Sequence, residues 1–437
     1  MTTTSSSAQS GQPAASVIGG PGEVLTEPSS LKRAPIRGPL RRLLIMLIPT
    51  NLALFLVYGA VPGVLLPLQI TAINPADKVA NLAIVSTIGA FAAMVAQPIA
   101  GAISDRTRSR FGRRAPWMIF GALAGGLALV GMALSNGLVQ VAIAWTIAQI
   151  AFNFAQGPLS AVVPDRVPAA ALGTFAAIGG MAAMIGAIGG QVLGATFARS
   201  IGSGYFLLGG LALVFFALFV VFNRDKSSKD DERQPFKLID FLHTFWVNPL
   251  VHPDFFWAFA GRLLLYTGYF SVVGYNLFLL EDYVHLGNKA VGYVPLLGIL
   301  SLVGMVPAII VSGLLSDKLG RRKIFVFAAA VIVGVGLVIP IVMPTLTGMI
   351  IETVICGIGF GAYQSVDQAL MNQVLPSRSS FAKDLGVVNI AATLPQTLAP
   401  AVGGAIVIAF GYIGIFPVGI ILSVLGAFAV FFIRSVK

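Results

Sequence analysis

The sequence predicts an all-α membrane protein with twelve transmembrane helices in two pseudo-symmetric six-helix halves. Of its 437 residues, 57% are hydrophobic and only 10% are charged, whereas a soluble domain carries about 25% charged residues. Uncharged runs of about 20 residues, long enough to cross the hydrocarbon layer, recur along the chain. A charged loop, G-A-I-S-D-R-T-R-S-R-F-G-R-R from Gly101, recurs in shorter form from Gly313, and Asp105 and Asp317 are 212 residues apart. This offset is close to half the chain.

The first 39 residues are predicted to form a disordered cytoplasmic tail. They are rich in Ser, Thr, Gly and Pro and have almost no large apolar residue before Leu31. Such a composition cannot bury enough apolar surface to fold. The tail also lacks the basic start and apolar core of a signal peptide.

The two predicted halves, 40–222 and 255–437, are separated by a cytoplasmic loop at 223–254. The predicted spans are 43–65, 79–103, 115–134, 139–163, 172–197, 205–222, 255–280, 291–315, 324–343, 349–374, 385–408 and 413–433. Within the central loop, the aromatic-rich stretch 236–246 is interpreted either as a helix on the membrane surface or as an ordinary loop.

The distribution of basic residues predicts the orientation. On this span assignment, 24 of the 28 Lys and Arg lie on the side that carries both termini. Positive residues stay on the cytoplasmic side, so both termini are expected to be cytoplasmic, in a plasma membrane. The basic residues cluster at the ends of apolar segments, which favours the lipid bilayer as their partner and argues against nucleic acid.

The loop between the second and third spans resembles a motif of the major facilitator superfamily, G-x-x-x-D-R-x-x-x-x-x-G-R-R. Twelve spans and a long central loop agree with that family, and the resemblance covers nearly everything after the tail. The spacing of S-D-R-T-R-S-R-F-G-R-R and the segment V-P-D-R-V-P from Val163 look more like the glycoside–pentoside–hexuronide and sucrose carriers. This resemblance implies two halves that expose a central cavity alternately to each side of the membrane.

The resemblance also implies that the repeated loops latch the two halves in one conformation. An aspartate at a helix N-terminus is favoured by the helix dipole, and the arginines nearby can pair with it or with lipid phosphates. The alternative is that the basic residues only enforce topology. The predicted latch residues are Gly101, Asp105, Arg106, Gly112, Arg113, Arg114, Asp317 and Arg321.

Three charged residues fall inside predicted spans, where charges are costly and usually functional. Arg262 and Asp367 lie at a similar depth, about 10 Å from the cytoplasmic side, in spans 7 and 10. They are predicted to pair, either as a coupling site facing the cavity or as a structural lock between the two helices. Glu352 is expected near the outer surface, where it can reach water.

In the superfamily, helices 1, 4, 7 and 10 line the cavity, and those four spans carry polar and aromatic residues at helical spacing. Such a mixture suits small polar ligands, although amides also join helices to one another in membranes. The predicted substrate-binding residues are Asn51, Phe55, Tyr58, Gln149, Asn153, Gln156, Arg262, Tyr266, Tyr269, Gln364, Asp367 and Gln368.

The expected function is secondary transport of a small polar solute, a sugar or glycoside, with symport of a proton. Coupling is expected at Asp367 with Arg262, either alone or together with Glu352, because no His lies in a span. The alternative is export of a drug or metabolite. The spans lack the clustered His, Cys or paired carboxylates of a membrane enzyme, so no enzyme activity, metal or cofactor is expected. The protein is expected to work as a monomer.

Overall fold

The computed structural model describes residues 37–229, 251–374 and 381–434 of the chain. Regular structure in these ranges consists of α-, 3-10 and π-helices, with no strand. Residues 1–36 of the predicted tail and the stretch 236–246 lie outside the described residues.

The N-terminal half contains six membrane-length helical segments. The first is continuous but changes its winding twice. The elements are α1 (Pro39–Ala60), η1 (Val61–Leu65), α2 (Leu66–Ile73), α3 (Lys78–Arg106), α4 (Ala115–Ala133), α5 (Leu138–Arg166), α6 (Ala169–Thr196) and α7 (Ile201–Phe222).

The C-terminal half repeats this pattern with a broken first segment. Its elements are α9 (Pro253–Val273), α10 (Asn276–Phe278), η2 (Leu279–Tyr283), η3 (Gly287–Lys289), α11 (Ala290–Leu319), α12 (Arg322–Val342), α13 (Leu346–Gln373), α14 (Phe381–Phe410), η4 (Tyr412–Gly414), α15 (Ile415–Ala429) and η5 (Val430–Phe432).

The predicted all-helical membrane fold is confirmed. Among the described residues, eleven helices are long and apolar enough to cross a membrane, and a bent pair raises the number to twelve. The bent pair is Pro253–Val273 with Asn276–Tyr283, which turn by 46° at the break. It corresponds to the seventh predicted span.

The first helical segment is longer than the predicted span 43–65 because proline does not end it. Pro39 stands in the first turn of α1, where its missing N–H removes no helical hydrogen bond. Pro62 lies in the first turn of the π-helix η1, after which the chain continues as α2 to Ile73. A π-turn inside an α-helix often marks a functional site, and Gly63 of η1 borders the cavity described below.

Each half packs through small residues that let helix backbones approach closely, as is common in membranes. A Cβ at Gly59 of α1 would lie 1.8 Å from the carbonyl oxygen of Ala187 in α6. A Cβ at Gly190 of α6 would lie 2.3 Å from the carbonyl oxygen of Leu56. These two positions hold α1 against α6 and exclude any larger residue.

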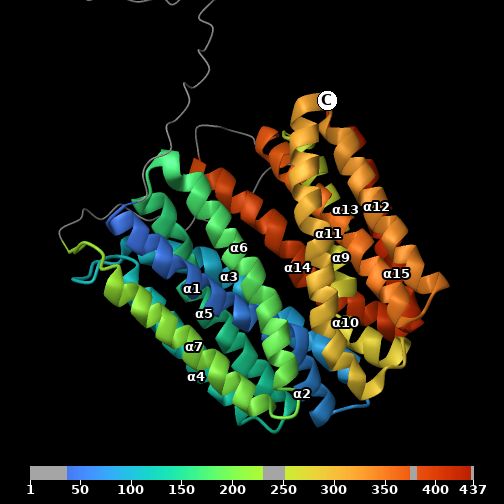
Figure 1. The fold of residues 1–437 in the computed structure, drawn as a ribbon, viewed down its shortest axis with the longest axis horizontal. Coiled ribbons are helices and arrows are strands. Elements are labelled where there is room, and N and C mark those ends of the chain that lie inside the picture. The colour runs from blue at the N-terminus through green and yellow to red at the C-terminus, as the bar shows by residue number, and fades with distance from the viewer. Residues whose placement is uncertain (1–36, 230–250, 375–380, 435–437) are drawn as a thin grey trace, which may run out of the picture.

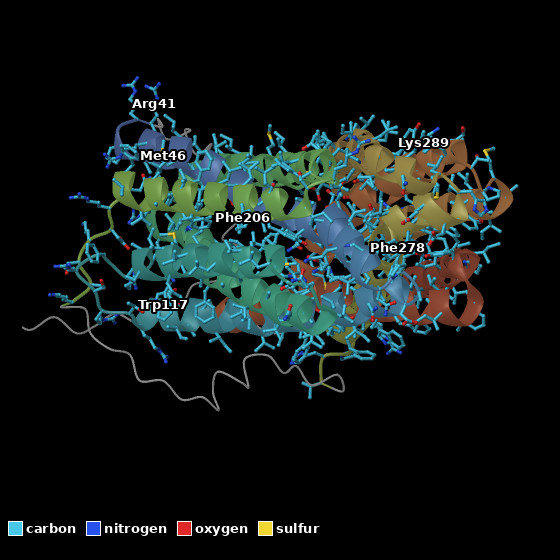
Figure 2. The ribbon with its side chains drawn as sticks, turned by 90° about the horizontal axis from the view of Figure 1, so that it is seen from below. Arg41, Met46, Trp117, Phe206, Phe278 and Lys289 are labelled. Carbon is cyan, nitrogen blue, oxygen red and sulfur yellow. The ribbon has the colours of Figure 1, made fainter. Side chains whose placement is uncertain are left out.

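The two halves stand side by side, and α14 runs along their junction (Figure 1). The helices α6 and α11, one from each half, lie close at one end and separate toward the end where the C-terminus lies (Figure 1). Large apolar side chains cover the outside of both halves, as a lipid-facing surface requires. Arg41, in the first turn of α1, extends away from the helices (Figure 2).

Candidate functional site

A cavity of about 490 Å³ lies between the two halves. The N-terminal half contributes η1 and α6 to its wall, and the C-terminal half contributes α9, α10, α11 and α13. Because the wall belongs to both halves, any relative movement of the halves changes the shape of the cavity. Its lining residues are Gly63, Gly180, Met184, Ala187, Ile188, Gln191, Tyr269, Val273, Asn276, Val294, Leu297, Gly298, Ser301, Leu302, Met305, Ile309, Glu352, Thr353, Cys356, Phe360 and Gln364.

Glu352 is the one charged residue in this lining. It is 5% exposed, and its carboxylate accepts a hydrogen bond of 3.1 Å from the hydroxyl of Thr353. The expectation that Glu352 reaches water at the outer surface is wrong, because the residue is buried in the wall between the halves. The error arose because the sequence gives depth along α13 but not what packs around the helix.

Gln191 brings an amide into the same cavity from α6. Its Oε1 atom is buried and has no hydrogen-bond partner among the described residues. A Cβ at Gly298 of α11 would lie 2.4 Å from this oxygen, so the glycine makes room for the amide where α6 and α11 meet. A buried polar atom without a partner is costly, and a ligand hydroxyl or a water molecule in the cavity would satisfy it.

Tyr269 and Phe360 form a flat aromatic surface on the wall of the cavity. Their rings are stacked, with centroids 4.1 Å apart and planes inclined by 9°. Tyr266 joins the same cluster, with its ring centroid 5.0 Å from that of Phe360. A flat ring surface beside amide and hydroxyl groups is the kind of mixture found in small-ligand sites.

Arg262 and Asp367 are in contact in the structure. Nε of Arg262 donates to Oδ2 of Asp367 at 2.5 Å, and the two side chains are only 2% and 1% exposed. A second guanidinium nitrogen donates to Oε1 of Gln368 at 3.2 Å. The ring of Tyr266 lies 5.9 Å from the guanidinium carbon. This pair joins α9 to α13, and neither residue is among those lining the 490 Å³ cavity.

The predicted residues of the N-terminal half form a separate group. Tyr58 donates to Oε1 of Gln156 at 3.1 Å, linking α1 to α5, and the ring of Phe55 meets that of Tyr58 edge-on at 5.7 Å. Asn51 and Asn153 each donate to a backbone carbonyl one turn earlier in their own helix. Gln149 supplies that carbonyl to Asn153 and is itself half-buried.

Thus, of the twelve residues predicted to bind substrate, Tyr269 and Gln364 line the described cavity. Outside this lining, Tyr58 contacts Phe55 and Gln156, and Arg262 contacts Asp367, Gln368 and Tyr266. Asn51 and Asn153 bond to carbonyls of their own helices, that of Gln149 among them. The sequence reasoning missed Gln191 and Ser301, because it considered only spans 1, 4, 7 and 10. It also missed Thr353, which lies in span 10 but was not among the polar residues chosen there. An amide near the C-terminal end of the glycine-rich α6 is the signal that could have indicated Gln191.

The halves are joined at one end by Lys78, the first residue of α3. Its ammonium lies 3.2 Å from Oε2 of Glu281 and 2.9 Å from Oδ2 of Asp282, both in η2 of the other half. Tyr412 donates to the same Asp282 oxygen at 2.5 Å. These contacts hold the halves together at the end that we call the Lys78 side.

The first repeated loop contains a buried arginine, Arg114, between two carboxylates. NH1 of Arg114 lies 2.6 Å from Oδ1 of Asp105, and NH2 lies 3.0 Å from Oδ2 of Asp165. Ser104 accepts a further hydrogen bond from Arg114 at 2.7 Å. The cluster therefore joins α3, α4 and α5 within the N-terminal half. Asp165, in the segment V-P-D-R-V-P, was not predicted to take part.

The other predicted residues of this loop surround that cluster. Gly101 lies on α3 about one turn before Asp105, and Arg106 is the last residue of that helix. Gly112 has φ of 86° and packs against Asp225, where a Cβ would lie 2.3 Å from the aspartate Cβ. Arg113 is partly exposed. The first residues of the central loop thus pack on the repeated loop.

In the second repeated loop, Asp317 pairs with Arg322, which was not among the predicted latch residues. NH2 of Arg322 lies 2.9 Å from Oδ1 of Asp317, and NH1 donates to the carbonyl oxygen of Ala369 at 3.1 Å. Arg321 is exposed and precedes the first turn of α12. The pair is open to water, since the Asp317 side chain is 66% exposed. The ion pairs of Arg114 and of Arg322 therefore each lie within one half.

Comparison with known sequences identifies the family. The sequence model of the Major Facilitator Superfamily matches residues 43–380 and 290–437. The chain belongs to the major facilitator superfamily. This membership makes the chain a membrane transporter.

Curated relatives match over a smaller part of the chain. MdtD of Salmonella paratyphi B and of Salmonella typhimurium, whose name calls it a multidrug resistance protein, is 30% identical over 151 residues. That match spans 35% of this chain and only 30% of the length of MdtD.

Solved structures share the fold over nearly the whole chain at low identity. The nucleoside transporter NupG has a TM-score of 0.72 at 13% identity, covering 89% of this chain and 99% of NupG. A D-xylose-proton symporter has a TM-score of 0.65 at 14% identity, covering 92% and 98%. A bacterial homologue of the human lysosomal transporter Spinster, inward-facing and unoccupied, has a TM-score of 0.64 at 14% identity, covering 90% and 95%.

Proposed function

We propose that this transporter carries a small solute with several hydroxyl groups, a sugar or glycoside, by alternating access and together with a proton. The observation that supports the proposal is the cavity between the halves. Its wall combines amides, hydroxyls and one carboxylate with the stacked rings of Tyr269 and Phe360. Amide and carboxylate groups can bond to hydroxyls, and a flat ring can cover the apolar face of a sugar.

Alternating access requires contacts that exist in only one conformation. The bonds of Lys78 to Glu281 and Asp282 cross from one half to the other, so opening the Lys78 side must break them. At the opposite end, the cluster of Arg114 with Asp105 and Asp165 gives the repeated loop a rigid shape that can dock onto the other half after it moves. We place this end, with both termini, in the cytoplasm of a cell bounded by the plasma membrane, and take the single chain as the working unit.

The second candidate is export of a drug or metabolite. It is favoured by the match to MdtD and by the largely apolar part of the cavity wall, which includes Met184 and Met305. Methionine side chains adapt to ligands of different shapes. A solute with one polar end and a large apolar body would suit this surface, whereas a sugar would leave the methionines without a partner.

Transport by purified protein in proteoliposomes separates the two candidates. We expect uptake of at least one labelled mono- or disaccharide to rise with an imposed proton gradient. Tyr269→Ala should lower that uptake about tenfold, because it removes the flat ring from the wall. Phe428→Ala is the matched control, since Phe428 is 51% exposed on the outside of α15 and should transport like the wild type. Uptake of none of the sugars, with proton-dependent movement of a lipophilic dye instead, would support export.

A further inference from the structure

We propose that Glu352 is the proton-binding site of this transporter and that its carboxyl group carries the proton that crosses with each solute. The proposal rests on the proposed function and specifies where its coupling ion binds. The sequence places coupling at Asp367 with Arg262 and gives Glu352 at most an accessory role. That expectation remains a prediction that the same experiment decides.

Glu352 is ionisable and buried, and no oppositely charged side chain contacts it among the described residues. No described Lys, Arg or His lies within ion-pair distance of its carboxylate, and the residue is 5% exposed. Asp367, on the same helix, differs because Arg262 lies 2.5 Å away. Asp367 can therefore stay ionised within its pair, whereas Glu352 has only neutral donors, the hydroxyl of Thr353 and the thiol of Cys356, to stabilise a negative charge.

An unpaired carboxylate is expensive to keep in a membrane-embedded wall. The neutral acid is the form that fits when the cavity is closed to water. When water fills the cavity, the carboxylate can be hydrated and the proton can leave. Each movement of the halves therefore favours a bound proton at Glu352, and each opening allows the proton to exchange with the solution on that side.

The groups that face Glu352 offer no competing site at neutral pH. On its own helix the titratable neighbour is Cys356, and on α9 it is Tyr269, whose phenol also lies beside Ser301. The lining residues from η1, α6, α10 and α11 are amides, hydroxyls or apolar groups. The charged residues of α12 are Arg322 and Lys323. They lie in the first turn of α12, whereas Glu352 lies near the start of α13, which follows the other end of α12. In η2, Glu281 and Asp282 are held by Lys78.

The position of Glu352 also links the proton to the solute. The carboxyl group shares the cavity with the unsatisfied oxygen of Gln191 and with the rings of Tyr269 and Phe360. A protonated carboxyl can both donate to and accept from a solute hydroxyl. It can thus hold the solute without leaving a charge behind when the halves close, so that closure is easiest when solute and proton are both bound.

The test uses full-length protein and two readouts, one of which needs no solute. Infrared spectra of the reconstituted protein at neutral pH report the carbonyl stretch of a protonated carboxyl. We expect this band in the wild type, its loss in Glu352→Gln, and its persistence in Asp367→Asn. In proteoliposomes, Glu352→Gln should still exchange labelled sugar between the two sides, but its proton-driven accumulation should fall at least tenfold.

Several results would overturn the proposal. The band could be absent from the wild type, remain in Glu352→Gln, or disappear in Asp367→Asn, and the proton would then lie elsewhere. Accumulation by Glu352→Gln at the wild-type level would exclude Glu352 as the coupling site. Loss of sugar exchange as well as of accumulation would mean that Glu352 serves solute binding and not coupling, which also contradicts the proposal. If Glu352→Gln fails to fold, Glu352→Asp replaces it in the test. This variant keeps a carboxyl group, so it should shift the frequency of the infrared band and retain proton-driven accumulation of sugar.

This design separates the failure of the inference from that of the proposed function. If no sugar is carried but the band behaves as expected, the proton site stands and the proposed solute class is wrong. If sugar uptake follows the proton gradient while the band assigns the proton to another residue, the proposed function stands and the inference is wrong.

Discussion

Removing either member of the buried pair Arg262 and Asp367 should destabilise the protein more than removing both. The side chains are 2% and 1% exposed, so neither can be hydrated after its partner is lost. Breaking a buried pair typically costs about 3–5 kcal/mol. We therefore expect Arg262→Ala and Asp367→Ala each to lose about 4 kcal/mol of unfolding free energy. The double variant should lose less than either single variant.

The two single variants should differ in their response to pH. In Arg262→Ala the orphaned carboxyl can become neutral by taking a proton, so its loss of stability should shrink as the pH falls. In Asp367→Ala the orphaned guanidinium cannot lose its proton. That loss should stay nearly constant with pH, reduced only by the remaining bond to Gln368 at 3.2 Å.

The assay is unfolding of the purified variants in mixed detergent micelles, followed by the fluorescence of the four Trp residues. Asp317→Ala supplies a matched control, because Asp317 also pairs with an arginine but its side chain is 66% exposed. Exposed pairs contribute about 0–1 kcal/mol, so this control should unfold almost like the wild type. The wild type, the two single variants and the double variant form a double-mutant cycle. The cost of the cavity left by Arg262→Ala occurs in both the single and the double variant, so it cancels when the four stabilities are compared. Additive losses in the double variant would refute the reasoning, since they would mean that the two charges do not stabilise each other.

The remaining predictions concern movement of the two halves. Asp105→Asn should leave insertion intact but slow transport severalfold, because Arg114 would keep only one charged partner; an unchanged rate at equal expression would exclude a latch role. Lys78→Gln removes the ion pairs that cross between the halves. For a partly exposed group such pairs are worth about 1 kcal/mol, which corresponds to roughly a fivefold shift in the equilibrium between the closed and the open Lys78 side. Alkylation of the chain's single cysteine, in the cavity wall, should therefore become faster from the Lys78 side, and an unchanged rate would show that other contacts hold the halves. Gly298→Ala should lower transport because its Cβ would meet Oε1 of Gln191 at 2.4 Å, and Gln191→Ala should restore part of the rate if that clash is the cause.

The sequence by itself determined the features that depend on local composition. The twelve spans followed from runs of apolar residues, because the cost of placing a peptide segment in hydrocarbon is set by that segment alone. The break in the helix after Val273 did not change the assignment of the seventh span, because the helical pieces on both sides of the break are apolar. The duplication was visible in the repeated loops, which were identified from Asp105 and Asp317. The similar depth of Arg262 and Asp367 also followed from counting residues along antiparallel helices.

Only the tertiary structure decided which side chains meet. Packing between segments more than a hundred residues apart decides which face of a helix points inward and how far apart the two halves lie. Examples are the contacts of Arg262 with Asp367 and of Lys78 with Glu281. Hydropathy does not encode the rotation of a helix about its axis when apolar residues surround it on all sides, as in α11. For this reason the sequence assigned Asn153 to the cavity although it bonds to its own helix. It left Glu352 at the surface for the same reason, although close packing of α6, α11 and α13 encloses this carboxyl between the two halves.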